Sequence, residues 1–262
     1  QTGKLSLPII VCTITTSLII AWILQKILKV PANTSILVGV GSSICGGSAI
    51  AATAPVIDAD DDEIAQSIAV IFFFNVLAAI FFPILGKAIG FDTVHGDAFG
   101  IFAGTAINDT SSVTAAASTW DSMWNLGSET LNKAVTVKLT RTLAIIPITL
   151  GLSLIRARQS AKEGKQAAKF SFKRAFPMFI LYFVLAAIIT TVCVHMGVNA
   201  EVFHPLKELS KFMIIMAMAA IGLNSNVIQL IKTGGKPIIV GASCWCGITA
   251  VSLIMQHIMR IW

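Results

Sequence analysis

Charged residues are scarce in this sequence. Only 12% of its 262 residues are Asp, Glu, Lys or Arg, whereas 55% are hydrophobic, and the mean hydropathy is +0.82. A soluble domain usually carries about a quarter of charged residues, so this chain lacks the polar surface that a globule needs in water. Its apolar runs also reach the roughly 20 residues that a helix needs to cross a bilayer. These features exclude a soluble globule and predict an all-α, polytopic membrane helix bundle.

Cysteine is also scarce and follows no pairing pattern. The five cysteines are odd in number, lie in apolar segments, and have no metal-ligand spacing with histidine. They are therefore read as small buried hydrophobes rather than disulfides or metal ligands. The sequence has no nucleophile–base pair that would indicate an enzyme, and we expect no metal and no cofactor. The chain opens at Gln1 without a signal peptide, and we expect further N-terminal helices to precede it.

Eight apolar segments are candidate spans of a single transmembrane domain over residues 1–262. They are residues 7–28, 35–57, 64–85, 98–120, 131–155, 175–195, 209–223 and 237–258. The loop 156–174 carries seven bases against one acid, Glu163. The positive-inside rule places this loop in the cytoplasm. Membrane topology thus accounts for most of the net charge of +6, and no nucleic-acid partner is expected.

Two of these segments contain an internal repeat. Residues 41–54 align without a gap to residues 104–117, and glycine, hydroxyl, isoleucine, a polar break and an alanine-rich tail recur in the same order. Repeated, glycine-interrupted hydrophobic segments are typical of the binding site of a secondary transporter. Broken backbone is tolerated at membrane depth only inside protein or beside a water-filled cavity. Close helix packing by small residues is the alternative reading.

The geometry of the repeat stays open at this point. Each segment has about 23 residues, which suffices for one crossing helix or for a re-entrant hairpin with two half-depth arms. Two hairpins would form an inverted repeat, whereas two crossing helices would be parallel.

Ionisable residues inside the spans are few. Asp109 is the only acid there, and Lys138 and Arg141 are the only bases well inside a span, spaced i and i+3 on one helix face. Two cations in a bilayer must face the protein interior, and together with the hydroxyls at the breaks they favour an oxyanion. Asp109 is the candidate coupling or counter-charge residue. The candidate substrate-binding residues are Ser42, Ser43, Gly46, Gly47, Ser48, Asn75, Asn108, Thr110, Ser111, Ser112, Lys138 and Arg141.

Structural roles remain open for some of these residues. Asp109 and Arg141 are able to form an ion pair that holds helices together, and Asn75 is able to serve as an interhelical amide.

The broken segments and the basic pair carry a family resemblance. The stretches SSICGGSAIAA (42–52), PVID (55–58), AGT (103–105), NDTSSV (108–113) and VKLTR (137–141) closely resemble the YeiH-type family of proposed sulfate exporters, which are bacterial inner-membrane proteins. The resemblance covers most of the chain and implies further N-terminal helices in the full-length protein. This family is grouped distantly with sodium/proton antiporters and bile-acid symporters. That grouping implies a transporter fold with a panel and a core, in which Asn108 and Asp109 match the antiporters' acidic motif.

These features together favour a multi-pass secondary transporter that moves a small inorganic or organic oxyanion, such as sulfate, across the bacterial inner membrane. Its expected partners are the lipid bilayer, the anion, and a proton or sodium ion for coupling; a homodimer stays open. The first alternative is a cation/proton antiporter in which Asp109 carries the ion and the two bases are structural. The second is a membrane scaffold subunit that transports nothing.

Overall fold

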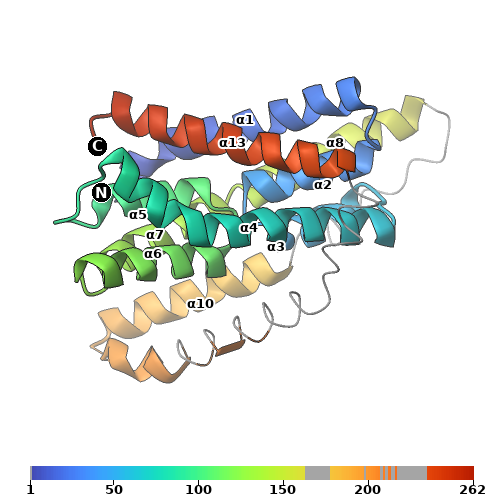
Figure 1. The fold of residues 1–262 in the computed structure, drawn as a ribbon. Coiled ribbons are helices and arrows are strands. Elements are labelled where there is room, and N and C mark those ends of the chain that lie inside the picture. Colours follow the sequence, from blue (N-terminus) through green and yellow to red (C-terminus); the bar gives the residue numbers. More distant parts are fainter. Residues whose placement is uncertain are drawn as a thin grey trace.

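The structure is a computed structural model that describes residues 2–162, 178–197, 199–206, 209, 212–213, 216 and 235–262. These residues form a bundle of helices without strands (Figure 1), as the sequence predicts. The elements are α1 (Thr2–Leu28), α2 (Ala32–Ser43), α3 (Gly47–Thr53), η1 (Ala54–Val56), α4 (Asp61–Ile89), α5 (Asp97–Ala106), α6 (Thr110–Trp124), α7 (Glu129–Thr142), α8 (Ile145–Lys162), α10 (Met178–His195), η2 (Ala200–Phe203) and α13 (Gly235–Ile258).

Four helical segments are long and apolar enough to cross a membrane among the described residues. They are Leu5–Leu28 in α1, Asp61–Ile89 in α4, Glu129–Arg156 across α7 and α8, and Gly235–Ile258 in α13. They confirm the predicted spans 7–28, 64–85, 131–155 and 237–258. The predicted span 175–195 overlaps α10, whereas most of 209–223 and of the basic loop 156–174 lies outside the described residues.

The span Glu129–Arg156 is interrupted between α7 and α8. Pro147 has no N–H to donate to the carbonyl of Leu143, so the regular helical bond is lost there. The backbone tightens instead, with the N–H of Ile146 donating to the Leu143 carbonyl at 3.3 Å. This interruption lies directly after Arg141 and separates the site-bearing half of the span from α8.

The first repeated segment, residues 32–56, is a re-entrant hairpin, hereafter hairpin 1. Its first arm is α2 and its second arm is α3 with η1, separated by a break at residues 44–46. Asn33, at the start of α2, donates from Nδ2 to Glu63 Oε2 at the start of α4 at 3.0 Å, and Arg156 near the end of α8 donates to Asn33 Oδ1. Hairpin 1 therefore enters and leaves at the end of the bundle where α4 begins.

The second repeated segment, residues 97–124, is hairpin 2 and enters from the opposite end. Its arms α5 and α6 flank a break at residues 107–109. Asp97, at its start, pairs with Lys133 at 2.7 Å. Near its end, the Asp121 carboxylate accepts the N–H groups of Thr130 and Leu131, each at 3.0 Å. Both ends of hairpin 2 thus meet the start of α7, and the two repeats are inverted.

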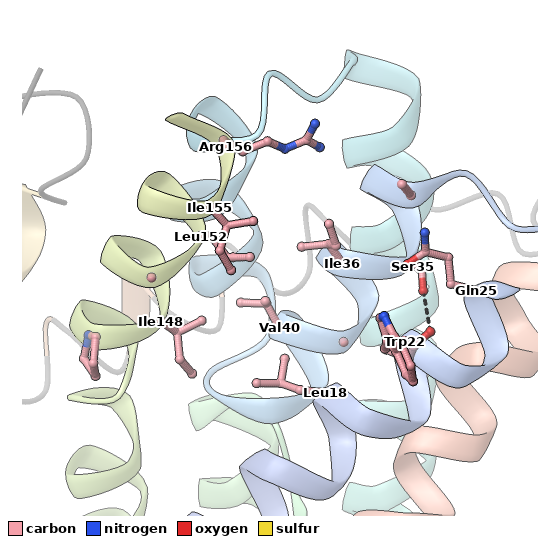
Figure 2. Close-up of a pocket in the computed structure, with 15 residues that line it drawn as sticks. Leu18, Trp22, Gln25, Ser35, Ile36, Val40, Ile148, Leu152, Ile155 and Arg156 are labelled. Atoms are coloured by element: carbon pink, nitrogen blue, oxygen red, sulfur yellow. Dashed lines mark hydrogen bonds between the residues drawn. The ribbon is translucent and has the colours of Figure 1, made fainter. Parts of the chain in front are cut away.

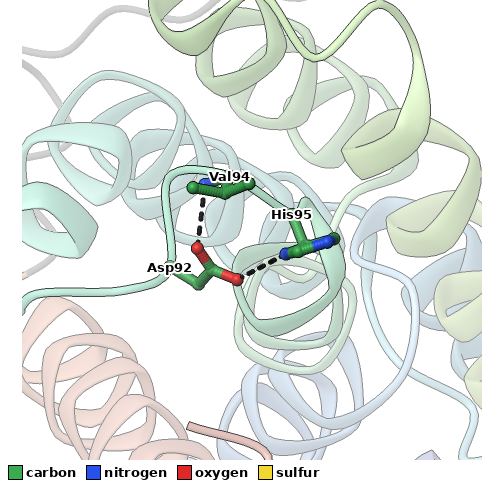
Figure 3. Close-up of polar contacts among 3 residues, drawn as sticks. All are labelled: Asp92, Val94 and His95. Atoms are coloured by element: carbon green, nitrogen blue, oxygen red, sulfur yellow. Dashed lines mark hydrogen bonds and ion pairs between the residues drawn. The ribbon is translucent and has the colours of Figure 1, made fainter.

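Capping residues fix the ends of α4, which joins the two hairpins. Asp60 and Glu63 form a capping box at its start, so part of the acidic run 58–63 is structural. Gly90 ends the helix in the left-handed conformation with φ 87°. In the following loop, Asp92 accepts the Val94 N–H at 2.8 Å and contacts His95 at 3.0 Å (Figure 3). These contacts, the Val94 bond first, lower the pKa of Asp92.

The remaining spans, α1 and α13, pack against each other and against both hairpins. Ser17 of α1 donates to the carbonyl of Gly39 in hairpin 1 at 3.0 Å. Ser252 of α13 lies 2.7 Å from the hydroxyl of Thr105 in hairpin 2. Stacking of Phe99 on Trp120, with ring centroids 4.3 Å apart, joins the two arms of hairpin 2. The backbone breaks of both hairpins are largely buried among these helices.

Candidate functional site

The side chain of Arg141 joins the tips of the two hairpins. Its Nε donates to the carbonyl of Ser43 and its Nη2 to that of Ser42, each at 2.7 Å. Its Nη1 donates to the carbonyl of Thr105 at 2.7 Å and more weakly to that of Ile107 at 3.3 Å. All three guanidinium nitrogens are therefore engaged, and the side chain is 0% exposed.

Lys138 makes the same connection one helical turn earlier on α7. Its Nζ donates to the carbonyl of Ile44 at 2.6 Å, to that of Ile107 at 3.2 Å, and to that of Asn108. An ammonium group has three donors, so these bonds use all of them. Both breaks therefore lie at one place beside α7. We call this place the junction and define it as residues 44–46 and 107–109 with the side chains that contact them.

The contacts of the two cations follow the internal repeat. Residues 41 and 104 align with an offset of 63 residues, which pairs Ser42 with Thr105 and Ile44 with Ile107. Arg141 binds the carbonyls of the first pair, and Lys138 binds the carbonyls of the second. One helix thus recognises the same backbone positions in both repeats.

This arrangement has a clear electrostatic cause. Arms α2 and α5 end at the junction, and a helix C-terminus presents unpaired carbonyls with about half a negative elementary charge. Burying a cation is expensive unless hydrogen bonds satisfy it, and here the carbonyls do so. The ion pair between Asp109 and Arg141, the alternative structural role of these residues, is not formed: within the described residues, ion pairs join Lys133 to Asp97 and His95 to Asp92.

Asp109 instead caps the N-terminus of α6. Its Oδ2 accepts the N–H of Ser111 at 3.0 Å and that of Ser112 at 3.2 Å, and also the hydroxyl of Ser111. The equivalent residue of hairpin 1 is Gly46, with φ 69° and ψ −130°. An added Cβ at Gly46 would lie 3.5 Å from the Asp109 Cβ. The two equivalent caps therefore face each other across the junction.

Asn75 of α4 is fully buried beside these caps. Its Oδ1 accepts the N–H of Asn108 at 3.1 Å and that of Asp109 at 3.3 Å. Its Nδ2 has no hydrogen-bond partner among the described residues, and neither does Nδ2 of Asn108. A buried donor left unpaired usually costs about 1–3 kcal/mol. The junction therefore holds two amide groups that lack an acceptor.

The structure brings most, though not all, of the predicted site residues to the junction. Ser42 and Ser43 take part through their carbonyls, and the Ser43 hydroxyl bonds Val40 within the helix. Lys138, Arg141, Asn75, Asn108, Asp109, Gly46, Ser111 and Ser112 are also there. Thr110 follows Asp109 and is half-buried, whereas Ser48 is exposed and Gly47 lies against the ring of Phe72.

The carbonyl ligands were not predictable from the sequence, because backbone atoms carry no residue signature. The carbonyls of Ile44, Thr105 and Ile107 are ligands of the cations, yet none of these residues was a candidate. One signal was available: the offset of 63 residues pairs Asn75 with Lys138. Both side chains reach the break of hairpin 2 from equivalent helices.

A separate groove of about 580 Å³ lies between α1, α2 and α8. It is mainly apolar, with Trp22, Gln25 and Arg156 around its rim (Figure 2). Its wall is stabilised by the bond from the Ser35 hydroxyl to the Ala21 carbonyl at 2.8 Å. None of the predicted site residues lines this groove, so it is distinct from the junction.

Comparison with known proteins identifies relatives along almost the whole chain. Residues 1–241 match the family model described as "Conserved hypothetical protein 698". A UPF0324 membrane protein of Streptococcus mutans is 63% identical over 261 residues, which cover 99% of this chain and 75% of the relative. A UPF0324 membrane protein of Fusobacterium nucleatum is 56% identical over 271 residues, covering 99% and 76%. No solved structure matches the chain.

Proposed function

The chain belongs to the conserved hypothetical protein 698 family, whose relatives are named UPF0324 membrane proteins, and from its own geometry we propose that it is a secondary transporter. The transporter would carry a small oxyanion, such as sulfate, across the bacterial inner membrane. The observation that carries it is the meeting of two inverted, re-entrant hairpins at a buried cation pair.

Interrupted helices at membrane depth support transport rather than a scaffold role. Backbone breaks deep in a bilayer leave polar groups that must be satisfied, and they recur where transporters bind substrate and coupling ions. Here α4 and the α7–α8 segment span the bundle, while both breaks lie between them at the junction. A membrane scaffold has no need of such a polar centre.

The formal charge at the junction supports an anion. Lys138 and Arg141 contribute two positive charges and Asp109 one negative charge, which leaves one positive charge if all three are ionised. The N–H donors of the two cations are already bound to carbonyls. They would therefore favour an anion through the electric field of the site, while other donors contact it directly.

The contacts also suggest which parts move. Lys138 and Arg141 tie both hairpins to α7, so these elements would shift together during transport. The hydrogen bonds that join α1 and α13 to the hairpins come from hydroxyl groups, at Ser17, Ser35 and Ser252, and involve no buried charge. We expect the hairpin unit to move against α1 and α13, and so to open the junction alternately to each side.

Uptake of labelled sulfate into proteoliposomes tests the proposal. Vesicles loaded with unlabelled sulfate should accumulate label by counterflow, and protein-free vesicles should not. Thiosulfate, phosphate and methanesulfonate, tested as competitors, would define the anion class. Lack of counterflow with every one of these anions, under gradients of proton and of sodium, would refute the proposal.

A cation/proton antiporter is the second candidate, favoured by one observation. Asp109 is the single carboxylate at the junction and is only partly buried, as an ion carrier must be. This alternative predicts sodium-driven proton movement in vesicles that contain no transportable anion. It also predicts that Asp109→Asn abolishes that movement, whereas the anion transporter shows none.

A further inference from the structure

The junction offers donors for which the described residues supply no acceptor. Asn75 Oδ1 accepts two backbone N–H groups, which fixes Nδ2 on the opposite side of its amide. Asn108 Oδ1 accepts from Arg141 Nη2 at 3.4 Å, and this bond fixes which side of the Asn108 amide carries Nδ2. Both Nδ2 groups lack a partner among the described residues, and the two side chains are 0% and 1% exposed. The two buried amides are therefore hydrogen-bond donors that are held in a fixed orientation.

The Asn75 donor lies close to the place where the two hairpin caps meet. Its Nδ2 lies 3.6 Å from the position that a Cβ would take at Gly46, and the Asp109 Cβ lies 3.5 Å from that same position. Because Gly46 has no Cβ, no side-chain atom occupies this position beside the Asn75 amide. A ligand oxygen bound there would lie close to the Asp109 side chain.

The Asp109 carboxylate has one oxygen in use and one available. Every described hydrogen bond to it goes to Oδ2. The ionisable groups whose charges act on it are Lys138 on α7 and Cys45 in the break of hairpin 1, with Arg141 one helical turn beyond Lys138, while α4 contributes the neutral amide of Asn75. The donors of both cations are bound to carbonyls, so neither pairs directly with Asp109.

We propose that the amide groups of Asn75 and Asn108 are the direct ligands of the oxyanion, and that one proton binds Asp109 with each anion. This inference rests on the proposed oxyanion transport. An anion at the Asn75 amide lies close to the Asp109 side chain, and two like charges close together in a largely buried site repel strongly. A proton on Asp109 removes that repulsion and adds a donor for the anion. The transported unit is then one anion with one proton.

Thermodynamic linkage predicts how the dissociation constant of the anion depends on pH. If one proton is taken up with each anion, the dissociation constant of the anion rises by about tenfold per pH unit over the range in which binding is accompanied by proton uptake. Sulfate and methanesulfonate do not titrate near neutral pH. A pH dependence of their dissociation constants therefore arises from a group of the protein.

The first test compares binding of labelled sulfate and of methanesulfonate to the purified full chain between pH about 5 and about 9. We expect the wild type to follow the tenfold slope, and Asp109→Asn to bind with less than about twofold variation over the range. Asparagine remains a good N-cap, so this variant should fold. Asp97→Asn, at the outer end of the same hairpin, is the matched control and should keep the wild-type slope. An Asp109→Asn variant that keeps the slope would overturn the coupling.

The second test removes the donor of Asn75 and retains its acceptor. Asn75→Asp keeps an oxygen for the N–H groups of Asn108 and Asp109 but replaces Nδ2 by oxygen, and sulfate affinity should fall by about tenfold or more. Asn132→Asp, on the exposed face of α7, should bind as the wild type does. Wild-type affinity in Asn75→Asp would overturn the ligand assignment.

Transport distinguishes failure of this inference from failure of the proposed function. Sulfate flux that is independent of pH and moves no protons would reject the coupling and leave the transporter standing. Absence of flux with every tested anion would reject both.

Discussion

At the residue scale, the two buried cations bind backbone carbonyls of both hairpins and so hold the hairpins together. A reading of side chains alone makes Lys138 and Arg141 anion ligands, because cations at that depth need a negative partner. The structure supplies that partner as the C-terminal carbonyls of α2 and α5. The residues of the site were therefore predictable from their charge and depth, but their partners were not.

Replacing Arg141 by lysine tests the clamp. Arg141→Lys keeps the charge but cannot reach Ser42, Ser43 and Thr105 at once, because lysine has three donors on one atom. We expect a loss of about 2–5 kcal/mol in unfolding free energy and at least about a tenfold loss of sulfate counterflow. Thermal unfolding in detergent and vesicle uptake measure the two effects. Arg156→Lys, which retains a single contact with Asn33, is the control and should change both quantities little.

Gly46 provides a second test at this scale. Gly46→Ala places a Cβ on backbone with φ 69° and ψ −130°, which strains it by about 1–3 kcal/mol. That Cβ also fills the space in front of the Asn75 amide. We expect a lower melting temperature and loss of sulfate binding. Gly151→Ala, in α8 with nothing within 4 Å, should be neutral or stabilising by about 0.5–1 kcal/mol; equal effects of the two substitutions would contradict the account.

At the element scale, the repeat was visible in the sequence but its geometry was not. Two segments of about 23 residues fit either a crossing helix or a hairpin. The decision depends on contacts distant in sequence, such as Asn33 with Glu63 and Asp121 with Thr130. Local patterns carry no information on such pairings. Helix ends were more predictable, because capping residues at Asp60 and Asp109 are local signals.

Membrane sidedness of the loops tests the hairpins directly. In a cysteine-free variant, Asp62→Cys and Val94→Cys report the two ends of α4. The hairpin topology puts residue 62 on the side of Lys26 and residue 94 on the side of Arg260; crossing segments would exchange the two. Labelling of right-side-out and inverted vesicles with an impermeant maleimide measures this, with Lys26→Cys and Arg260→Cys as side markers. Modification of residue 62 together with the Arg260 marker would rule out re-entrant hairpins.

The loop between α4 and α5 should respond to pH independently of the junction. The pKa of Asp92 is lowered in the folded protein by the Val94 N–H and by His95. Its small contribution to stability is therefore present above the ordinary carboxyl pKa and is lost as the pH falls through the lowered folded pKa. Asp92→Ala should reduce the melting temperature slightly at neutral pH and less in acid. Sulfate uptake by this variant should equal that of the wild type, since the loop lies at the outer end of hairpin 2.

At the scale of the whole molecule, the re-entrant hairpins agree with the charge distribution. Lys26, Arg156 and Lys236 lie at the end of the bundle where hairpin 1 enters, as the positive-inside rule requires of the cytoplasmic side. The acidic run 58–63 lies at that same end, where Glu63 contacts Asn33. Counting two crossing segments in place of the hairpins gives the same side for the basic residues, so sequence counting alone could not separate the two topologies.

The class of the fold was thus predictable, and so were most residues that the structure brings to the junction, but their assembly there was not. Hydropathy identified the spans that the structure describes, and depth in the span identified Arg141. The convergence of residues 44–46 and 107–109 on one helix face required the three-dimensional arrangement. The unpartnered amides of Asn75 and Asn108 became evident only there.

Counterflow of labelled sulfate in proteoliposomes, with the wild type, Arg141→Lys and Arg156→Lys measured side by side, tests whether the junction is the site of anion transport. An oxyanion transporter with its site at the junction predicts label accumulation in the wild type and in Arg156→Lys, and at least about a tenfold lower rate in Arg141→Lys. Equal rates in all three proteins would contradict the assignment of the junction as the transport site.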